Sequence, residues 1–288
     1  MDSSLINHIE SQLGEPIKNY QTVSGGDISE AYKLTTNSAV FFLKIHSSPN
    51  ALTMFEAEKA GLMLISSTNT IKTPKILLCG SFKEWTFLVM EFIASKSPNS
   101  KDFKLLGHKL AELHQITSNN FGLTNDNFIG SLPQFNTLNS TWSTFYCHQR
   151  LQPQLRLAQN KKLLNPNECP DELVILNRME ELCKNIKPSL LHGDLWSGNY
   201  QISKDGTPYL IDPAVFYGHN EVDIAMSLLF GGFGDSFYTA YFNTFKKDKG
   251  FDDRIQLYQL YYYLVHLNLF GRSYYPAVAQ ILKQQFKM

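Results

Sequence analysis

The chain has 288 residues, of which 43% are hydrophobic and 18% are charged, a composition typical of a folded protein and not of a disordered one. Lys and Arg number 26, and so do Asp and Glu, so no positive excess favours binding to nucleic acid. The polar N-terminus lacks the pattern of a signal peptide, and no apolar run approaches the roughly 18 residues of a membrane span. The 4 cysteines form no C-x-x-C pair, which favours free thiols in a reducing compartment. We therefore expect a cytoplasmic protein without a nucleic-acid, membrane or obligate protein partner.

The first third of the chain alternates short β-like runs with one helix. Apolar residues at helical spacing predict that helix over residues 51–66. Runs rich in aliphatic and aromatic residues predict the strands: two around a glycine-rich turn within residues 20–36, then 39–46, 72–82 and 85–93. This pattern indicates a small, mainly antiparallel sheet.

The rest of the chain is mostly helical. A polar connector follows the last strand. Helical patterns then cover residues 103–116, 142–158, 170–186, 221–232 and 253–271. We therefore predict an α+β protein of two lobes. Residues 1–93 would form a lobe with a small antiparallel sheet and one helix, and residues 94–288 a larger, mainly helical lobe. A cleft between two lobes is a common place for a ligand.

The segment HGDLWSGN contains the most informative spacing in the chain. Asp194 is followed five residues later by Asn199, and Asp212 comes after a short apolar strand. Phosphoryl transfer needs a carboxylate that orients the attacking hydroxyl, together with oxygen ligands that hold Mg²⁺ on the nucleotide phosphates. The spacing of His, Asp and Asn equals that of the kinase catalytic loop H-R-D-L-x-x-x-N. Asp and Asn beside Gly are also common in turns, but a turn needs only one of the three residues.

Lys44 lies in the apolar strand segment FFLKIH, like the lysine of the kinase V-A-I-K motif, which contacts nucleotide phosphates. Burying a lysine without a partner is costly, so we expect a carboxylate from the following helix. Glu58 is the first candidate and Glu56 the second, because the pattern leaves the phase of the helix open. A solvent-facing lysine on the sheet is the alternative.

Two further segments are expected to bind a nucleotide through their backbone. They are Gly25, Gly26 and Asp27 in the turn between the first two strands, and Glu91, Phe92 and Ile93 at the end of the last strand. The glycines lack a Cβ, so the N–H groups of that turn can approach a phosphate closely. The second segment would hydrogen-bond the edge of adenine, an expectation that rests on position only. An ordinary hairpin turn and an ordinary strand end have the same composition.

Four segments together resemble the fructosamine kinase (ketosamine 3-kinase) family, within the kinase-like aminoglycoside and choline phosphotransferase group. They are LLHGDLWSGN, IDPAVFYGH, LLFGGF and LYQLYYYLVHLNLFGR, and the similarity runs from the glycine-rich turn to the C-terminal helix. The resemblance implies a two-lobed protein-kinase-like fold. It also implies phosphorylation, with ATP and Mg²⁺, of the sugar 3-hydroxyl of ketoamines, which are fructosamine or ribulosamine adducts of amines or protein lysines. The phosphorylated adduct would then decompose and release the amine, a deglycation.

The resemblance assigns roles to the candidate residues by position. Asp194 matches the catalytic base. Asn199 and Asp212 match the Mg²⁺ ligands. Lys44 and Glu58 match the lysine that binds phosphate and its carboxylate partner.

Trp196 and His266 would bind the sugar-bearing substrate. An aromatic plane packs against the C–H face of a sugar, and Trp196 within the catalytic loop is specific to this family. The alternatives are a core tryptophan that anchors the loop and a core histidine on a helix rich in tyrosine. Tyr261, Tyr262 and Tyr263 cannot share one helix face, and which of them borders the cleft is left open.

A few positions beside these motifs complete the interpretation. Pro213 follows the metal-binding aspartate where regulated protein kinases have Phe-Gly, and Asp27 stands where some relatives carry a cysteine, so no thiol switch is expected there. His219, Glu221 and Asp223 form another polar cluster. Asp223 begins an apolar helix, where a carboxylate meets the helix dipole favourably, and we expect it to brace the catalytic loop.

Other functions agree less well with the sequence. A kinase for an aminoglycoside, choline or another small alcohol is the nearest alternative, and Trp196 disfavours it. A catalytically silent nucleotide-binding or scaffold protein would not need all of the expected polar groups. A serine hydrolase would need a G-x-S-x-G motif, and a protein kinase D-F-G and A-P-E motifs, which the sequence lacks. A zinc site is disfavoured because there is no C-x-x-C or H-x₃-H pair.

Overall fold

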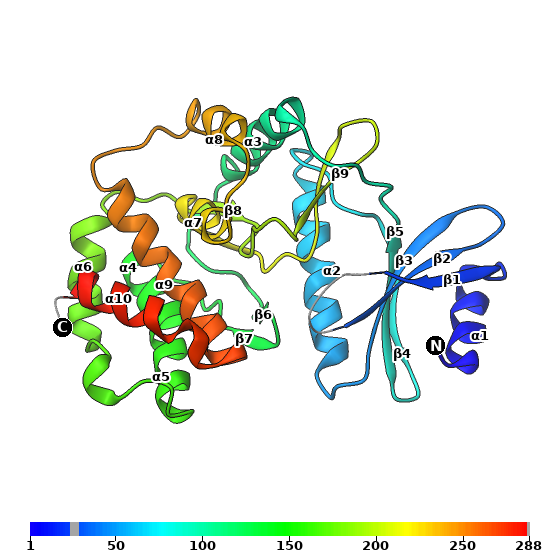
Figure 1. Cartoon of the computed structure of the whole chain (residues 1–288), viewed down its shortest axis with the longest axis horizontal. Helices are drawn as coiled ribbons and strands as arrows, with labels where there is room; N and C mark the ends of the chain where they lie inside the picture. Colours follow the sequence, from blue (N-terminus) through cyan, green and yellow to red (C-terminus); the bar gives the residue numbers. More distant parts are fainter. Residues whose placement is uncertain (24–28, 287–288) are drawn as a thin grey trace. The chain divides into compact units, whose positions relative to one another are not determined.

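The computed structural model describes residues 1–23 and 29–286 of the chain (Figure 1). The chain forms two compact units. The first unit is Met1–Pro98 with Tyr200–Asp212, and the second is Asn99–Asn199 with Pro213–Met288. Within the described residues, we find no helix that is both long and apolar enough to cross a membrane.

A five-stranded antiparallel sheet forms the centre of the first unit, with the strand order β1-β2-β3-β5-β4. Its elements are β1 (Asn19–Thr22), β2 (Glu30–Thr35), β3 (Val40–His46), β4 (Ile76–Phe82) and β5 (Trp85–Glu91), with α1 (Ser3–Leu13) and α2 (Ala51–Ser67). Alternate residues of β5 face opposite sides of the sheet. Val89 packs in a core that includes Ile9 of α1, whereas Leu88 packs with Phe55 of α2. The expected strands and the helix after β3 are therefore present.

Helix α1 is a second helix of the first unit, which the sequence-based prediction did not include. The carboxylate of Asp2 caps it and accepts hydrogen bonds from the N–H groups of Ser4 at 2.6 Å and Leu5 at 3.3 Å. Leu5 and Ile9 are both fully buried against the sheet. The sequence does contain a weak signal for this helix, namely two apolar residues one helical turn apart after a capping aspartate. The otherwise polar composition of the segment obscured it.

A hairpin from the middle of the chain joins the first unit. It consists of β9 (Tyr200–Ile202) and β10 (Pro208–Leu210). Backbone N–H groups of Lys96 and Leu210 donate to the carbonyl groups of Ile202 and Lys72, each at 2.9 Å. These bonds tie the polar connector to the hairpin, so the first unit extends to Pro98, beyond the expected boundary at Ile93, and includes a segment that the sequence placed in the second lobe.

The second unit is mainly helical. Its helices are α3 (Ser100–His114), α4 (Trp142–Tyr146), α5 (Gln152–Asn160), α6 (Glu172–Leu182), α7 (Glu221–Leu229), α8 (Asp235–Phe242), α9 (Phe251–Phe270) and α10 (Tyr275–Phe286). Shorter elements are β6 (Asn127–Ile129), β7 (Leu132–Gln134), β8 (Ser189–Leu191), β11 (Phe216–Gly218), the π-helical turn η1 (Cys147–Leu151) and the 3₁₀ turns η2 (Pro166–Glu168) and η3 (Arg272–Tyr274). The helix expected over residues 142–158 is thus interrupted by η1, and α8 and α10 were not predicted.

Helix α9 lies in the middle of the second unit and packs against α5, α7 and α10 (Figure 1). Tyr258, Tyr261 and Tyr262 are each at most 1% exposed, whereas Tyr263 is half-buried. A helix that is covered on nearly all sides has no polar face, which explains why Tyr258, Tyr261 and Tyr262 point in different directions and are all buried. Of the three tyrosines left open by the sequence, Tyr261 and Tyr262 belong to the core.

Candidate active site

Lys44 lies at the centre of a buried ionic cluster in the first unit. Its Nζ lies 2.8 Å from Oε1 of Glu58 and also contacts Oδ1 of Asp212. The side chain of Lys44 is 9% exposed and that of Glu58 is 14% exposed. Glu58 is therefore the carboxylate partner that the sequence predicted first, whereas Glu56 is exposed.

The protonation of this cluster depends on its burial. Burial alone would lower the pKa of Lys44, but the charges of Asp212 and Glu58 outweigh it and raise the pKa. Burial raises the pKa of Glu58 to about 8, and Lys44 opposes this rise. Near neutral pH, Glu58 is therefore largely protonated, and Lys44 and Asp212 form the charged pair. Asp212 also has φ +54, a left-handed conformation that is uncommon outside glycine, although aspartate adopts it more readily than most residues.

The loop after β8 carries Asp194 and Asn199 in the second unit. Asn199 Nδ2 donates hydrogen bonds to the backbone oxygen of Asp194 at 2.8 Å and to its Oδ2 at 3.2 Å. The side-chain nitrogen of Asn199 is thereby fixed toward Asp194. Gly193 makes the turn possible, because it has φ +85 and a Cβ there would lie 2.0 Å from the carbonyl oxygen of Ala214.

Asp223 of α7 braces this loop. Its carboxylate accepts hydrogen bonds from the backbone N–H groups of His192 and Gly193, each at 2.8 Å. Asp223 is fully buried. Burial alone would raise its pKa, but His114 and the hydrogen bond from Gly193 lower it, so the carboxylate stays charged. The bracing role predicted for Asp223 is confirmed.

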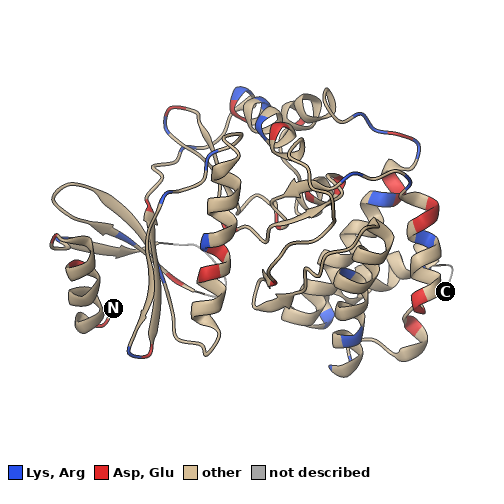
Figure 2. Ribbon diagram, turned by 180° about the vertical axis from the view of Figure 1, so that it is seen from behind, with Lys and Arg blue, Asp and Glu red and all other residues tan. Residues whose placement is uncertain are grey.

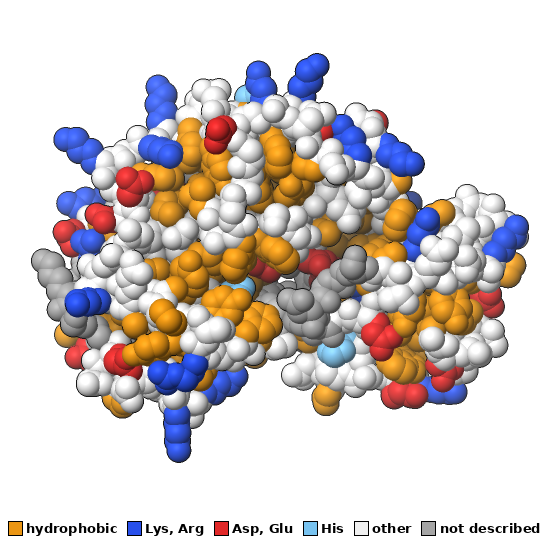
Figure 3. Space-filling view, in the orientation of Figure 1, with side chains coloured by type: hydrophobic (Ala, Val, Ile, Leu, Met, Phe, Trp, Pro, Cys, Tyr) orange, Lys and Arg blue, Asp and Glu red, His pale blue; other side chains and the backbone are white. Residues whose placement is uncertain are grey.

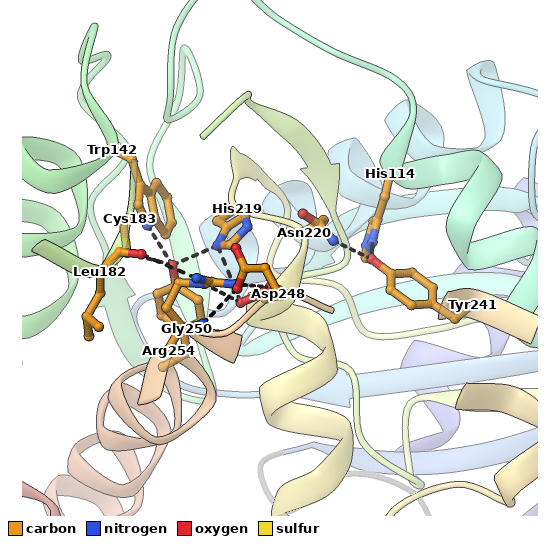
Figure 4. Close-up of polar contacts among 12 residues, drawn as sticks. His114, Trp142, Leu182, Cys183, His219, Asn220, Tyr241, Asp248, Gly250 and Arg254 are labelled. Carbon is orange, nitrogen blue, oxygen red and sulfur yellow. Dashed lines mark hydrogen bonds and ion pairs between the residues drawn. The ribbon is translucent and has the colours of Figure 1, made fainter. Parts of the chain in front are cut away.

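A buried hydrogen-bonded chain extends from Asp223 toward the surface, and no sequence signal identified it. His114 Nε2 lies 3.0 Å from Asp223 Oδ2, and His114 Nδ1 lies 2.8 Å from the hydroxyl oxygen of Tyr241. Asn220 Nδ2 donates to the same hydroxyl oxygen at 2.7 Å (Figure 4). His114 comes from α3 and Tyr241 from α8, so tertiary packing brings them together. The loop after β8 is therefore held through side chains of α3, α7 and α8.

Trp196 and His266 both contact Phe230 in the second unit. The ring centroids of Trp196 and Phe230 lie 6.3 Å apart, and those of Phe230 and His266 lie 5.0 Å apart. Phe230 is 39% exposed. Figure 3 shows other hydrophobic side chains at the surface of the protein. A Cβ on Gly198 would lie 2.5 Å from the Trp196 ring, which explains the glycine after Trp-Ser in the motif. Phe230 was not predicted as a site residue.

The structure describes only one of the two segments that we expect to bind the nucleotide through their backbone. Gly25, Gly26 and Asp27 lie outside the described residues. The backbone N–H of Glu91 donates to the carbonyl oxygen of Lys75 at 2.8 Å, so it is already engaged. The ammonium group of Lys33 lies 5.0 Å from the centre of the Phe92 ring. A donor to adenine from this segment would have to be the backbone of Phe92 or Ile93.

The candidate residues for catalysis and for phosphate and metal binding thus form two groups. Lys44, Glu58 and Asp212 meet in the first unit, and Asp194 meets Asn199 in the second. The convergence of these two groups stays a prediction, because they belong to different units. In residues 1–23 and 29–286, no cluster of three or more His, Cys, Asp or Glu side chains could hold a metal ion.

Comparison with known proteins assigns the chain to a family. A sequence profile described as "Fructosamine kinase" matches residues 1–288. The chain belongs to the fructosamine kinase family. It is 42% identical over 264 residues to a protein of Enterococcus faecium named "Probable ketoamine kinase", with 91% of this chain and 93% of that protein covered. It is 41% identical over 272 residues to "Protein-ribulosamine 3-kinase, chloroplastic" of Arabidopsis thaliana, covering 93% of this chain and 82% of the relative.

Solved structures agree with the family. A crystal structure from Haemophilus somnus 129PT that bears the name of a fructosamine-3-kinase gives a TM-score of 0.87 at 28% identity, with 97% of this chain and 96% of that chain covered. An aminoglycoside phosphotransferase, APH(4)-Ia, gives a TM-score of 0.65 at 13% identity, with 98% of both chains covered, which shows a shared fold alone. The family and the kinase-like α+β fold predicted from the sequence are both confirmed.

Proposed function

We propose that this member of the fructosamine kinase family is a kinase that transfers a phosphoryl group from ATP to the sugar 3-hydroxyl of ketoamines. The relatives named ketoamine kinase and ribulosamine 3-kinase, over nearly the whole chain, support the reaction and the acceptor. The braced loop with Asp194 and Asn199 carries the proposal, because phosphoryl transfer depends mainly on positioned charge. Phosphorylated ketoamines would then decompose and release the amine, a deglycation.

Asp194 would orient the attacking hydroxyl and accept its proton. Its backbone is held at Gly193 and Asn199, so the carboxylate has little freedom to move away from the acceptor. Such positioning lowers the entropy that the reaction has to lose in the transition state. A general base of this kind contributes about 10²- to 10⁴-fold to the rate.

Lys44 would bind a phosphate of the nucleotide, and Glu58 would hold Lys44 in place. The ammonium group already lies between two carboxylates, so one of them can be exchanged for phosphate oxygens without leaving the lysine unpaired. The turn with Gly25, Gly26 and Asp27 and the backbone of Phe92 and Ile93 would complete the nucleotide site in the first unit.

Asp212 and Asn199 would each supply a ligand to Mg²⁺, as the resemblance to the family implies. Both supply hard oxygen ligands, and Mg²⁺ in kinases is held by one or two side chains together with substrate phosphates. Asn199 points its nitrogen at Asp194, so its carbonyl oxygen is the atom left for a metal. Bound Mg²⁺ would neutralise charge on the transferred phosphoryl group.

The sugar would pack against the aromatic side chains around Phe230. Trp196 and His266 contact this ring from different parts of the second unit, and Trp196 comes from the catalytic loop itself. Aromatic faces bind the C–H surfaces of sugars, while hydroxyl groups find polar partners. The exposed position of Phe230 suits an acceptor that is attached to a larger amine or to a protein lysine.

The reducing, cytoplasmic location and the absence of an obligate protein partner stay predictions. All four cysteines are free thiols, as the sequence suggested for a reducing compartment. A plant relative is named chloroplastic, so the compartment can differ within the family.

A panel of acceptors tests the proposal. Ribulosyl-lysine, fructosyl-lysine, an aminoglycoside and choline are each incubated with the protein, ATP and Mg²⁺, and ADP release is followed by a coupled assay. We expect turnover with one or both ketoamines, and NMR should place the phosphate on the 3-oxygen of the sugar. Turnover with choline or the aminoglycoside alone would support the alternative kinase. Binding of ATP without phosphorylation of any acceptor would indicate a catalytically silent protein.

A further inference from the structure

The second unit contains a cavity of about 640 Å³ that the proposed phosphoryl transfer does not use. It lies among the end of α6, the start of α7, the connection between α8 and α9, and the start of α9 (Figure 4). Cavities of roughly 300–1,000 Å³ accommodate small metabolites. Of the proposed catalytic and binding residues, none lines it; its lining includes Lys184, His219, Asn220, Glu221, Lys246 and Arg254.

The acidic side chains of this cavity are already paired with arginines. Glu181 lies 2.7 Å from Arg178. Arg254 donates to both carboxylate oxygens of Glu221 at 2.7 Å and to Asp248 at 2.7 Å. Such a two-pronged contact satisfies the geometry of a guanidinium and a carboxylate. The three carboxylates of the lining are therefore bound by two guanidinium groups, which leaves one negative charge.

The lysines of the cavity have no such partners. Lys184, Lys246 and Lys249 form no ion pair with any described residue. Two of them lie on the connection between α8 and α9, which Figure 2 shows as a largely basic segment. All three lysines are exposed. With Arg254 they give the lining four basic side chains against the carboxylates of Glu181, Glu221 and Asp248, and this excess of one positive charge favours an anion.

His219 adds a buried polar group to the same wall. Its side chain is 9% exposed, and its Nδ1 lies 2.8 Å from the hydroxyl oxygen of Tyr258. That oxygen accepts a hydrogen bond from Trp142 Nε1 at 2.9 Å and lies 3.2 Å from Cys183 Sγ (Figure 4). Since the imidazole nitrogen is the stronger acceptor, the Tyr258 O–H points at Nδ1. The ring proton is then on Nε2.

Because Nδ1 of His219 is engaged with Tyr258, the Nε2–H group is the hydrogen-bond donor of this ring that is left for a ligand. Among the described residues, Nε2 has no hydrogen-bond partner, and it is not sealed from solvent. His219 lines the cavity, so this is where the donor can be satisfied. Burial, assisted by the charge of Arg254, lowers the pKa of His219 to about 3, so at neutral pH the ring is an uncharged donor.

We propose that this cavity is a binding site for a small anionic metabolite that carries a phosphate or carboxylate group. The anionic group would contact Lys246 and Lys249 and accept a hydrogen bond from His219. Lys184, just after α6, would contribute a further positive charge. Charge-assisted hydrogen bonds of this type are about twice as strong as neutral ones. The site is distinct from the phosphate-binding Lys44, which lies in the first unit.

Isothermal titration calorimetry on the full chain tests this site, with inorganic phosphate and malonate as separate probes. The double variant Lys246→Ala/Lys249→Ala is compared with Lys204→Ala/Lys283→Ala, which removes the same charge at exposed positions outside the cavity. We expect one saturable site in the wild type and in the control. In the cavity variant its affinity should fall about tenfold, because two charge-assisted contacts are lost. His219→Gln should weaken binding as well.

The comparison of the two probes shows whether a phosphate or a carboxylate is preferred, and either result supports an anion site. Equal loss in both double variants would show an effect of net charge alone and would overturn the proposal, as would unchanged affinity in all variants. Phosphate that binds at a nucleotide site in the first unit would titrate equally in every variant. Failure of this proposal therefore leaves the proposed kinase activity untouched.

Discussion

Two ionic clusters of similar composition occupy the two units, and they differ in how the cation is held. Each has one basic side chain between two carboxylates: Lys44 with Glu58 and Asp212 in the first unit, and Arg254 with Glu221 and Asp248 in the second. Arg254 grips both oxygens of Glu221, and the pair is less than a tenth exposed. Lys44 touches each of its carboxylates with a single nitrogen.

This difference bears on which cluster can change when a ligand binds. A guanidinium fork fits one carboxylate in a fixed plane, whereas an ammonium group can exchange partners by rotating its hydrogens. We infer that Lys44 is arranged to change its partner when a ligand binds, and that Arg254 is arranged not to.

Replacing Lys44 by methionine should cause the largest effect, and it should fall on activity. The nucleotide phosphates would lose a positioned cation, and kcat/KM for ATP should drop about 10²- to 10³-fold. Thermal unfolding should change much less, because Glu58 can stay protonated once Lys44 is absent, as its raised pKa indicates. Steady-state kinetics and a melting curve on the same sample measure both. A lower melting temperature with unchanged kcat/KM for ATP would mean that Lys44, like Arg254, has a structural role.

Replacing Arg254 by methionine should give the reverse pattern. Removing one partner of a buried ion pair leaves Glu221 unpaired and should cost about 3 kcal/mol of unfolding free energy. Activity per folded molecule should stay within a few-fold. Urea unfolding measures the loss, and Lys109→Met serves as the control, since Lys109 and its partner Glu112 are 34% and 47% exposed and the pair should contribute less than about 1 kcal/mol. Equal losses in both variants would contradict the structural role of Arg254.

His219, beside the second cluster, should make the protein sensitive to acid. Its folded pKa is about 3 against an ordinary 6.5, so below pH 6.5 the unfolded chain binds a proton that the folded chain does not. Stability should therefore fall on acidification, by about 1.4 kcal/mol between pH 7.5 and 5.5. In His219→Gln this contribution disappears. The unfolding free energy of both proteins is measured as a function of pH in buffers free of phosphate and carboxylates, and it should fall more steeply with acidification in the wild type. Parallel pH dependences would rule out the buried neutral histidine.

The smallest expected effect concerns Phe230, where we propose that the sugar of the acceptor binds. Phe230→Ala should raise KM for a ketoamine about five- to tenfold, through loss of aromatic packing worth about 1 kcal/mol, while KM for ATP stays unchanged. Leu173→Ala, at a side chain that is 71% exposed on α6, is the control for removal of surface hydrophobic area. An equal change in both KM values would mean that Phe230 shapes the fold of the loop and does not contact the acceptor.

Sequence reasoning worked best where chemistry and local pattern coincide. The strand that carries Lys44, the helix that carries Glu58 and the spacing of HGDLWSGN each follow from residues close together in the chain, and the structure contains them. The brace by Asp223 was also predictable, because a carboxylate at a helix start beside a catalytic loop has few other partners.

The features that the sequence did not reveal depend on tertiary packing. Helix α1 has only two buried apolar residues, too few for a periodic signal. The hairpin of β9 and β10 joins the first unit through backbone bonds, which leave no trace in side-chain patterns. His114 and Phe230 acquire their roles from partners more than a hundred and more than thirty residues away, respectively.

The central claim, that Asp194 activates a sugar hydroxyl for phosphoryl transfer, is tested most directly by Asp194→Asn. Single-turnover transfer from ATP to ribulosyl-lysine or fructosyl-lysine is measured alongside the dissociation constant for ATP. We expect transfer to slow by at least about 100-fold while ATP binding changes less than about threefold, because the amide keeps the shape of the side chain but cannot accept the proton. Transfer within a few-fold of the wild-type rate would contradict the account.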